Sequence, residues 1–102
     1  MAIGATSAFR PTGTVSLNAG TTSANLPLAG GGETVVVTNT SAYLTYVRFG
    51  ADATVVASSS DMPVLPSSRA VLAVNSLISY AAACLTSGSG NVLFTRGDGS
   101  FL

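Results

Sequence analysis

Residues 33–49 decide the fold, and they read ETVVVTNTSAYLTYVRF. Residues 33–39 form a run rich in β-branched side chains, which favours a β-strand. Residues 39–41 are of the kinds found in turns. Residues 43–49 then alternate, with Tyr46 and Arg48 on one side of an extended chain and Val47 on the other. The stretch therefore predicts two strands joined by a turn.

Further short runs of alternating or β-branched residues predict more strands on both sides of this stretch. These predicted strands are residues 14–18, 24–26, 54–57, 69–74, 77–85 and 92–96. Turn residues recur at intervals of about ten, which is the spacing of an all-β sandwich or barrel. We therefore expect about eight strands in an all-β, antiparallel β-sandwich with jelly-roll-like connections.

Three connections are predicted from their turn residues. Ala19-Gly20 predicts a hairpin between the first two strands, and residues 88–91 (GSGN) predict a hairpin into the last one. Residues 62–66 (MPVLP) predict an edge strand or a crossing between sheets, because neither proline has the N–H that a central ladder needs.

The length of 102 residues predicts one domain. Residues 1–13 are mostly small, include Phe9, Arg10 and Pro11, and show no sustained periodicity, so we expect an extended N-terminal arm. Residues 14–102 are expected to form the single β-sandwich domain.

The composition is apolar and almost uncharged, with 47% hydrophobic and 8% charged residues and a formal net charge of zero. Because little long-range repulsion separates copies of such a chain, we expect a homo-dimer or homo-trimer. Polar residues or glycine interrupt every apolar run, so we expect no membrane span. The start of the chain lacks the features of a secretory signal, so we expect synthesis in the cytoplasm.

No enzyme chemistry is predicted from the residue types. The chain has no histidine, and its acids Glu33, Asp52, Asp61 and Asp98 stand far apart at predicted turns. Cys84 has no histidine to activate it and is interpreted as a small apolar filler. One cysteine cannot hold zinc, and the sequence around Asp98 is too short of acids for calcium. We therefore expect no catalytic residue, no cofactor and no metal site.

Two short motifs resemble binding sites, one for single-stranded nucleic acid and one for adhesion receptors, but each has a simpler interpretation. Arg48 beside Tyr43 and Tyr46 imitates an aromatic and basic strip for single-stranded nucleic acid. We favour aromatics that pack a core or a subunit seam, with Arg48 paired to a carboxylate, because four scattered arginines make no basic face. The tripeptide at 96–98 (RGD) is one that some adhesion receptors bind, but we favour ordinary turn chemistry there.

Four residues are the candidates for contacts with a protein partner. Phe9 and Arg10 are an aromatic and an arginine on an otherwise bland arm, and both types are enriched where chains anchor on partners. Folding of the arm back onto its own domain is the alternative. Tyr46 and Arg48 are the candidates on the strand predicted over residues 43–49.

Four segments of the chain resemble a known class of proteins. In order they are residues 37–40 (VTNT), 46–50 (YVRFG), 61–66 (DMPVLP) and 93–99 (LFTRGDG). This pattern resembles small β-sandwich virion proteins of tailed bacteriophages, over roughly residues 33–99. Residues 1–32 lie outside the resemblance.

The resemblance implies a non-enzymatic virion protein made in the host cytoplasm. Its expected role is capsid decoration or cementing, in which it binds the major capsid protein on the outer capsid surface and stabilises the shell against internal DNA pressure. The first alternative is a structural protein of the head-to-tail junction or tail. The second, from a different class, is a carbohydrate-binding or adhesion module.

Overall fold

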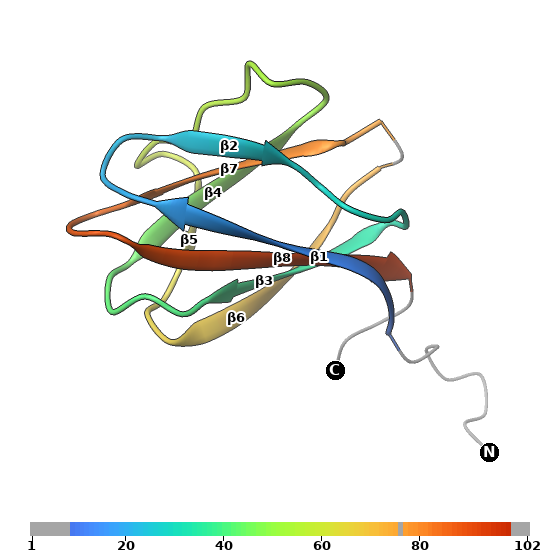
Figure 1. The fold of residues 1–102 in the computed structure, drawn as a ribbon, viewed down its shortest axis with the longest axis horizontal. Helices are drawn as coiled ribbons and strands as arrows, with labels where there is room; N and C mark the ends of the chain where they lie inside the picture. Colours follow the sequence, from blue (N-terminus) through green and yellow to red (C-terminus); the bar gives the residue numbers. More distant parts are fainter. Residues whose placement is uncertain (1–8, 76, 99–102) are drawn as a thin grey trace.

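The structure, a computed structural model, describes residues 9–75 and 77–98 and contains eight β-strands in that part of the chain (Figure 1). The strands are β1 (Arg10–Ala19), β2 (Ala24–Pro27), β3 (Thr34–Asn39), β4 (Thr45–Gly50), β5 (Met62–Val64), β6 (Ser68–Ala73), β7 (Tyr80–Leu85) and β8 (Gly90–Asp98).

The strands form two antiparallel four-stranded sheets that pack face to face (Figure 1). One sheet has the order β1-β8-β3-β6, and the other has the order β2-β7-β4-β5. The β4–β5 connection stays within one sheet, whereas every other connection between these strands crosses to the opposite sheet. Eight strands connected in this way form a jelly roll. The predicted antiparallel β-sandwich with jelly-roll-like connections is confirmed.

Both predicted hairpins are wrong, because the strands that they were to join lie in different sheets. β1 pairs with β8 and β2 pairs with β7, so residues 20–23 cross the sandwich. The turn after β7 likewise crosses to β8 in the other sheet. Two strands joined by a crossing each bury one face in the same core. Their alternation of apolar and polar residues is therefore the same as in two strands joined by a hairpin. The expectation for residues 62–66 is confirmed in both senses, since β5 is an edge strand and the chain crosses to β6 after it.

Several strand boundaries differ from the prediction; β7, for example, begins at Tyr80 and not at Leu77, and the two largest differences concern the N-terminal arm and residues 54–57. β1 begins at Arg10, so residues 10–13 of the predicted arm are strand, with Arg10 opposite Asp98 of β8. Residues 1–8 of that arm lie outside the described residues. Residues 54–57 are not a strand but belong to the β4–β5 loop, defined here as residues 51–61. Val55 and Ala57 instead pack that loop onto the sheet beneath it, whereas Thr54 and Val56 are exposed.

Inward-facing side chains of both sheets form one core between the layers. Its fully or nearly buried members are Leu17, Ala19, Val35, Val37, Val47, Val64, Val74, Ala81, Ala83, Leu85, Val92 and Phe94. The Phe94 ring contacts the Phe49 ring edge to face, with centroids 6.1 Å apart and planes at 80°. Such pairs add about 0.5–1.5 kcal/mol to the area that they bury.

Asn39 is a fully buried polar residue at the end of β3. The alternation of β3 turns it inward with Val35 and Val37. Its Nδ2 donates to the carbonyl oxygens of Tyr43 at 2.9 Å, Val64 at 3.1 Å and Leu65 at 3.2 Å. Its Oδ1 accepts from the N–H of Ser41 at 3.0 Å and from the Ser41 hydroxyl at 2.6 Å. One amide therefore ties the β3–β4 connection to the β5–β6 connection.

The substitution Asn39→Asp tests this tie, because it keeps the size of the side chain and replaces the donor by an acceptor. We expect a loss of about 3 kcal/mol or more in the free energy of unfolding at pH 7, since three carbonyl oxygens would then face a buried carboxylate. The loss narrows as the pH falls, because protonation of the buried acid restores one donor. Urea unfolding measures both effects.

The matched control for this prediction is Asn18→Asp. Asn18 is exposed on β1 and donates to Asn91 at 3.2 Å. The Asn91 amide can turn to donate instead, so we expect a change below about 0.5 kcal/mol. Equal losses for the two variants would show that the buried amide is not a structural tie.

Candidate functional site

The alternation of β4 places Tyr46 and Arg48 side by side on the outer face of the β2-β7-β4-β5 sheet. Thr45 and Val47 point the other way and are buried in the sandwich. Arg48 is exposed and Tyr46 is half-buried. The two predicted contact residues on this strand therefore share one surface.

Tyr46 packs against a second, smaller cluster on this outer face. The cluster consists of Ala57, Ala82 and Cys84, with Val55 and Tyr46 at its margin. Ala82 and Cys84 are small side chains on the outer side of β7, and Ala57 of the β4–β5 loop closes over them. Tyr46 is thus partly engaged within its own domain, as the favoured interpretation of the aromatics expects.

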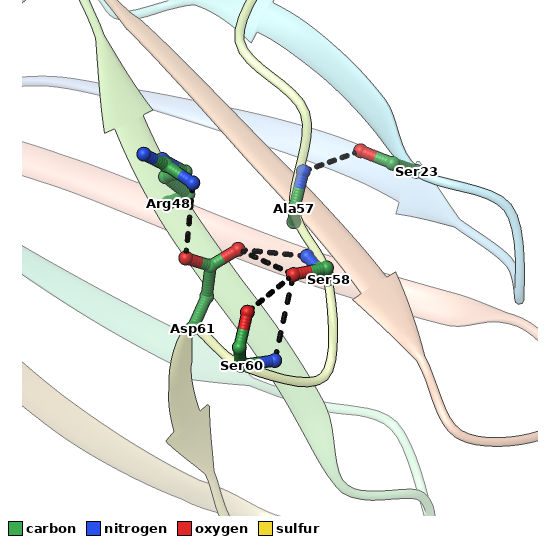
Figure 2. A network of polar contacts seen from close by, with 6 residues as sticks. All are labelled: Ser23, Arg48, Ala57, Ser58, Ser60 and Asp61. Atoms are coloured by element: carbon green, nitrogen blue, oxygen red, sulfur yellow. Dashed lines mark hydrogen bonds and ion pairs between the residues drawn. The ribbon is translucent and has the colours of Figure 1, made fainter.

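The β4–β5 loop is held on the sheet through its backbone. Asn25 of β2 donates from Nδ2 to the carbonyl oxygens of Ala53 at 2.8 Å and Val55 at 3.3 Å. The Ser23 hydroxyl accepts from the N–H of Ala57 at 2.8 Å (Figure 2). Side chains of the edge strand β2 and of the residue before it therefore hold a loop that follows β4, two strands away in the same sheet.

Asp61 joins the far end of this loop to Arg48 (Figure 2). The Arg48 Nη1 atom lies 3.5 Å from Asp61 Oδ1, and the Ser58 N–H donates to Asp61 Oδ2 at 2.7 Å. The Asp61 side chain is 13% exposed and the Arg48 side chain 59% exposed. A single contact of this length with an exposed arginine contributes little stability. Because the Arg48 side chain is more than half exposed, much of its guanidinium stays available to a partner.

Burial raises the pKa of the Cys84 thiol, and the negative charge of Asp61 raises it further. The reactive thiolate is therefore scarce at neutral pH. This environment agrees with the interpretation of Cys84 as an apolar filler.

An open hollow of about 400 Å³ lies between the end of β4 and the β4–β5 loop. Arg48, Asp52 and Val55 are among its lining residues. Asp52 is held in a local turn, where the hydroxyl and the N–H of Thr54 donate to it and lower its pKa. Its carboxylate therefore organises the loop.

Phe9 and Arg10 lie at the start of β1, in the other sheet from Tyr46 and Arg48. Phe9 is half-buried and Arg10 is exposed. The structure therefore arranges the predicted contact residues as two pairs on different sheets rather than as one cluster.

Arg96, the first residue of the RGD tripeptide, is buried and 5% exposed. Its Nε donates to the carbonyl oxygen of Gly32 at 2.9 Å, and its Nη2 donates to that of Asn75 at 3.2 Å. Its Nη1 donates to the carbonyl oxygen of Ile78. A receptor cannot reach this guanidinium in the folded domain, which disfavours adhesion through the tripeptide. The turn expected at residues 96–98 is also wrong, because these residues belong to β8 and pair with β1.

The buried, backbone-binding roles of Asn39 and Arg96 were not predicted from the sequence, although Arg96 belongs to the RGD tripeptide considered there. The strand alternation could have identified both, because Asn39 lies on the same inward face as Val35 and Val37, and Arg96 lies on the same inward face as Val92 and Phe94.

Within the described residues no group of three or more potential metal ligands comes together. No helix in residues 9–75 and 77–98 is long and apolar enough to span a bilayer.

Comparisons with protein-family models, curated proteins and solved structures found no match for this chain.

Asn25→Ala tests whether the β4–β5 loop shields Cys84. Loss of the two bonds to the loop carbonyls costs about 1 kcal/mol of loop docking, so labelling of the native thiol by a disulfide reagent is expected to rise about fivefold. The control Asn18→Ala removes an exposed strand asparagine on the other sheet and leaves the rate unchanged. Equal rates for the two variants would contradict the shielding.

Arg96→Met tests the buried guanidinium, because it keeps much of the side-chain volume and leaves three carbonyl oxygens without their donors. We expect a loss of about 2–4 kcal/mol in the free energy of unfolding, measured in urea. The matched change Arg48→Met removes an exposed arginine and is expected to cost less than about 1 kcal/mol. The expectation fails if the two variants unfold at the same urea concentration.

Proposed function

We propose that this chain is a non-enzymatic structural protein of a tailed-phage virion, which decorates and cements the outer capsid surface. The observation that carries the proposal is the jelly-roll strand order, β1-β8-β3-β6 over β2-β7-β4-β5. Viral capsid domains use this fold repeatedly. A fold alone does not fix a function, so the surface must also suit the role.

The surface supports a role in assembly. The chain has 8% charged residues, and several large apolar side chains are exposed on its loops and edge strands. They are Tyr43, Val56, Met62, Leu65, Val71 and Leu77. Exposed apolar side chains on a nearly uncharged surface favour burial against neighbours, and a symmetric shell repeats each such contact many times.

The proposed partners are the major capsid protein and further copies of this chain. In this proposal Phe9 and Arg10 at the start of β1 contact one neighbour, and Tyr46 and Arg48 contact another from the opposite sheet. Contacts on two sheets suit a protein that bridges identical sites. The domain itself would be made in the host cytoplasm and act on the capsid surface.

The copy number in purified virions tests the proposal. Quantitative gel analysis is expected to find the chain at a fixed ratio to the major capsid protein, as required of a decoration that covers the shell. A number sufficient for a single ring would instead support the head-to-tail junction or tail. Absence from virions, together with binding on a glycan array, would support the carbohydrate-binding alternative, because lectins also use this fold.

The double variant Phe9→Ala with Arg10→Ala tests the contact residues. We expect capsid occupancy to fall at least about tenfold and the heat resistance of the particle to fall with it, since aromatic and arginine anchors dominate many interfaces. The control Thr21→Ala with Thr22→Ala changes two exposed residues of the β1–β2 connection and leaves occupancy unchanged. Unchanged occupancy in the first variant would remove these residues from the interface.

A further inference from the structure

The sandwich has four edge strands, and three of them carry features that block pairing with another strand. β1 contains Pro11 and a register shift between Pro11 and Gly13. β2 has four residues and ends in Pro27, and β5 has three residues with Pro63 at its centre. Proline, bulges and short length are the usual protections of a sheet edge.

β6 is the edge strand without these protections. Its six residues, SRAVLA, contain no proline and one charged residue, Arg69, and they pair with β3 in one continuous register. Val71 at its middle is 42% exposed, and Met62 and Leu65 of the adjoining edge are 45% and 65% exposed. The lower edge of the sandwich in Figure 1 is therefore an open, apolar strand edge.

The hydrogen-bond pattern shows which backbone groups β6 presents at this edge. The N–H of Val74 donates to the carbonyl oxygen of Glu33 at 2.8 Å, and this pair continues the register in which Thr34 lies opposite Ala73. Directly bonded pairs alternate along an antiparallel ladder. The N–H and C=O groups of Arg69, Val71 and Ala73 therefore point away from β3, toward the open edge.

We propose that a second copy of this chain pairs with β6 through its own β6, antiparallel and about a two-fold axis at Val71. In this register Val71 lies opposite Val71 of the second copy, Arg69 opposite Ala73, and Ala70 opposite Leu72. Each outward-pointing N–H and C=O of these residues then meets its complement. The β1-β8-β3-β6 sheets of the two copies then become one continuous sheet across the dimer.

The side chains of β6 are self-complementary in this arrangement. At the axis two valines meet, and on either side of it a large side chain meets a small one, because Arg69 faces Ala73 and Leu72 faces Ala70. The two arginines do not face each other, so no like charges meet directly across the axis. A two-fold interface requires this kind of match between a surface and itself.

The partial burial of two core residues on β6 also supports a second copy at this edge. Ala70 and Leu72 point inward and pack against the core, yet both are only half-buried, whereas Val35 and Val37 on the neighbouring β3 are fully buried. A second β6 would extend the sheet over this incomplete end of the core. The inference deepens the self-association in the proposed function and rests on it, but it does not depend on a location in the virion.

Disulfide trapping tests the register directly. In a Cys84→Ala background, Val71→Cys places two thiols opposite each other, at a Cα separation of about 5.5 Å that a disulfide can span. Mild oxidation is expected to give a covalent dimer. Ala73→Cys is the matched control, because its thiol would lie opposite Arg69 and far from its own counterpart. The proposal is overturned if both variants cross-link equally or if neither does.

Sedimentation of the unmodified chain over a concentration series measures the same dimer without cross-linking. Val71→Lys sets two ammonium groups opposite each other and is expected to weaken the dimer at least about tenfold. Val56→Lys, at a 61% exposed valine of the β4–β5 loop, leaves it unchanged. A monomer at every concentration, or a dimer that tolerates Val71→Lys, would overturn the proposal.

These outcomes are separate from those of the proposed function. A β6 dimer in a chain that is absent from virions would leave the pairing intact and remove the virion role. A chain that occupies the capsid at high copy number but fails the cross-linking test would keep the virion role and remove the β6 pairing.

Discussion

Two buried polar side chains satisfy backbone groups that the jelly-roll connections leave without strand partners. Asn39 donates to carbonyl oxygens of the β3–β4 and β5–β6 connections, and Arg96 donates to those of the β2–β3 and β6–β7 connections. They lie toward opposite ends of the β3–β8 pair, with the apolar core between them. Because a buried carbonyl without a donor is costly, these two residues stabilise the four sheet crossings that they bind.

The alternation of residues was sufficient to predict the fold class and most strands. Residues 33–39 and 43–49 gave the central strands because their β-branched and aromatic side chains fit a pleated, half-buried surface. Residues 54–57 suggested a strand for the same reason, but Val55 is half-buried and Ala57 buried because their loop packs on a sheet, not because they pair within one. The hairpins could not be distinguished from crossings, because that difference depends on the sheet in which the next strand finds its partner.

The candidate site was predictable in part. Placing Tyr46 and Arg48 on one face required only the two-residue period of a strand, and the structure agrees. The carboxylate beside Arg48 proved to be Asp61 of the same chain, a contact made by a loop whose path no local pattern specifies. Asn39 and Arg96 follow the inward period of their strands, so extending that period past the apolar residues would have identified them.

The way in which the β4–β5 loop is docked has a consequence for evolution. Asn25 and Ser23 bind its main chain at Ala53, Val55 and Ala57, and these bonds do not depend on which side chains the loop carries outward. Exposed positions such as Val56 and Ser59 can therefore change while the backbone path is kept. A fixed scaffold thus carries a loop whose outward side chains can be exchanged, which suits the domain to acquire new binding specificities or to carry grafted peptides.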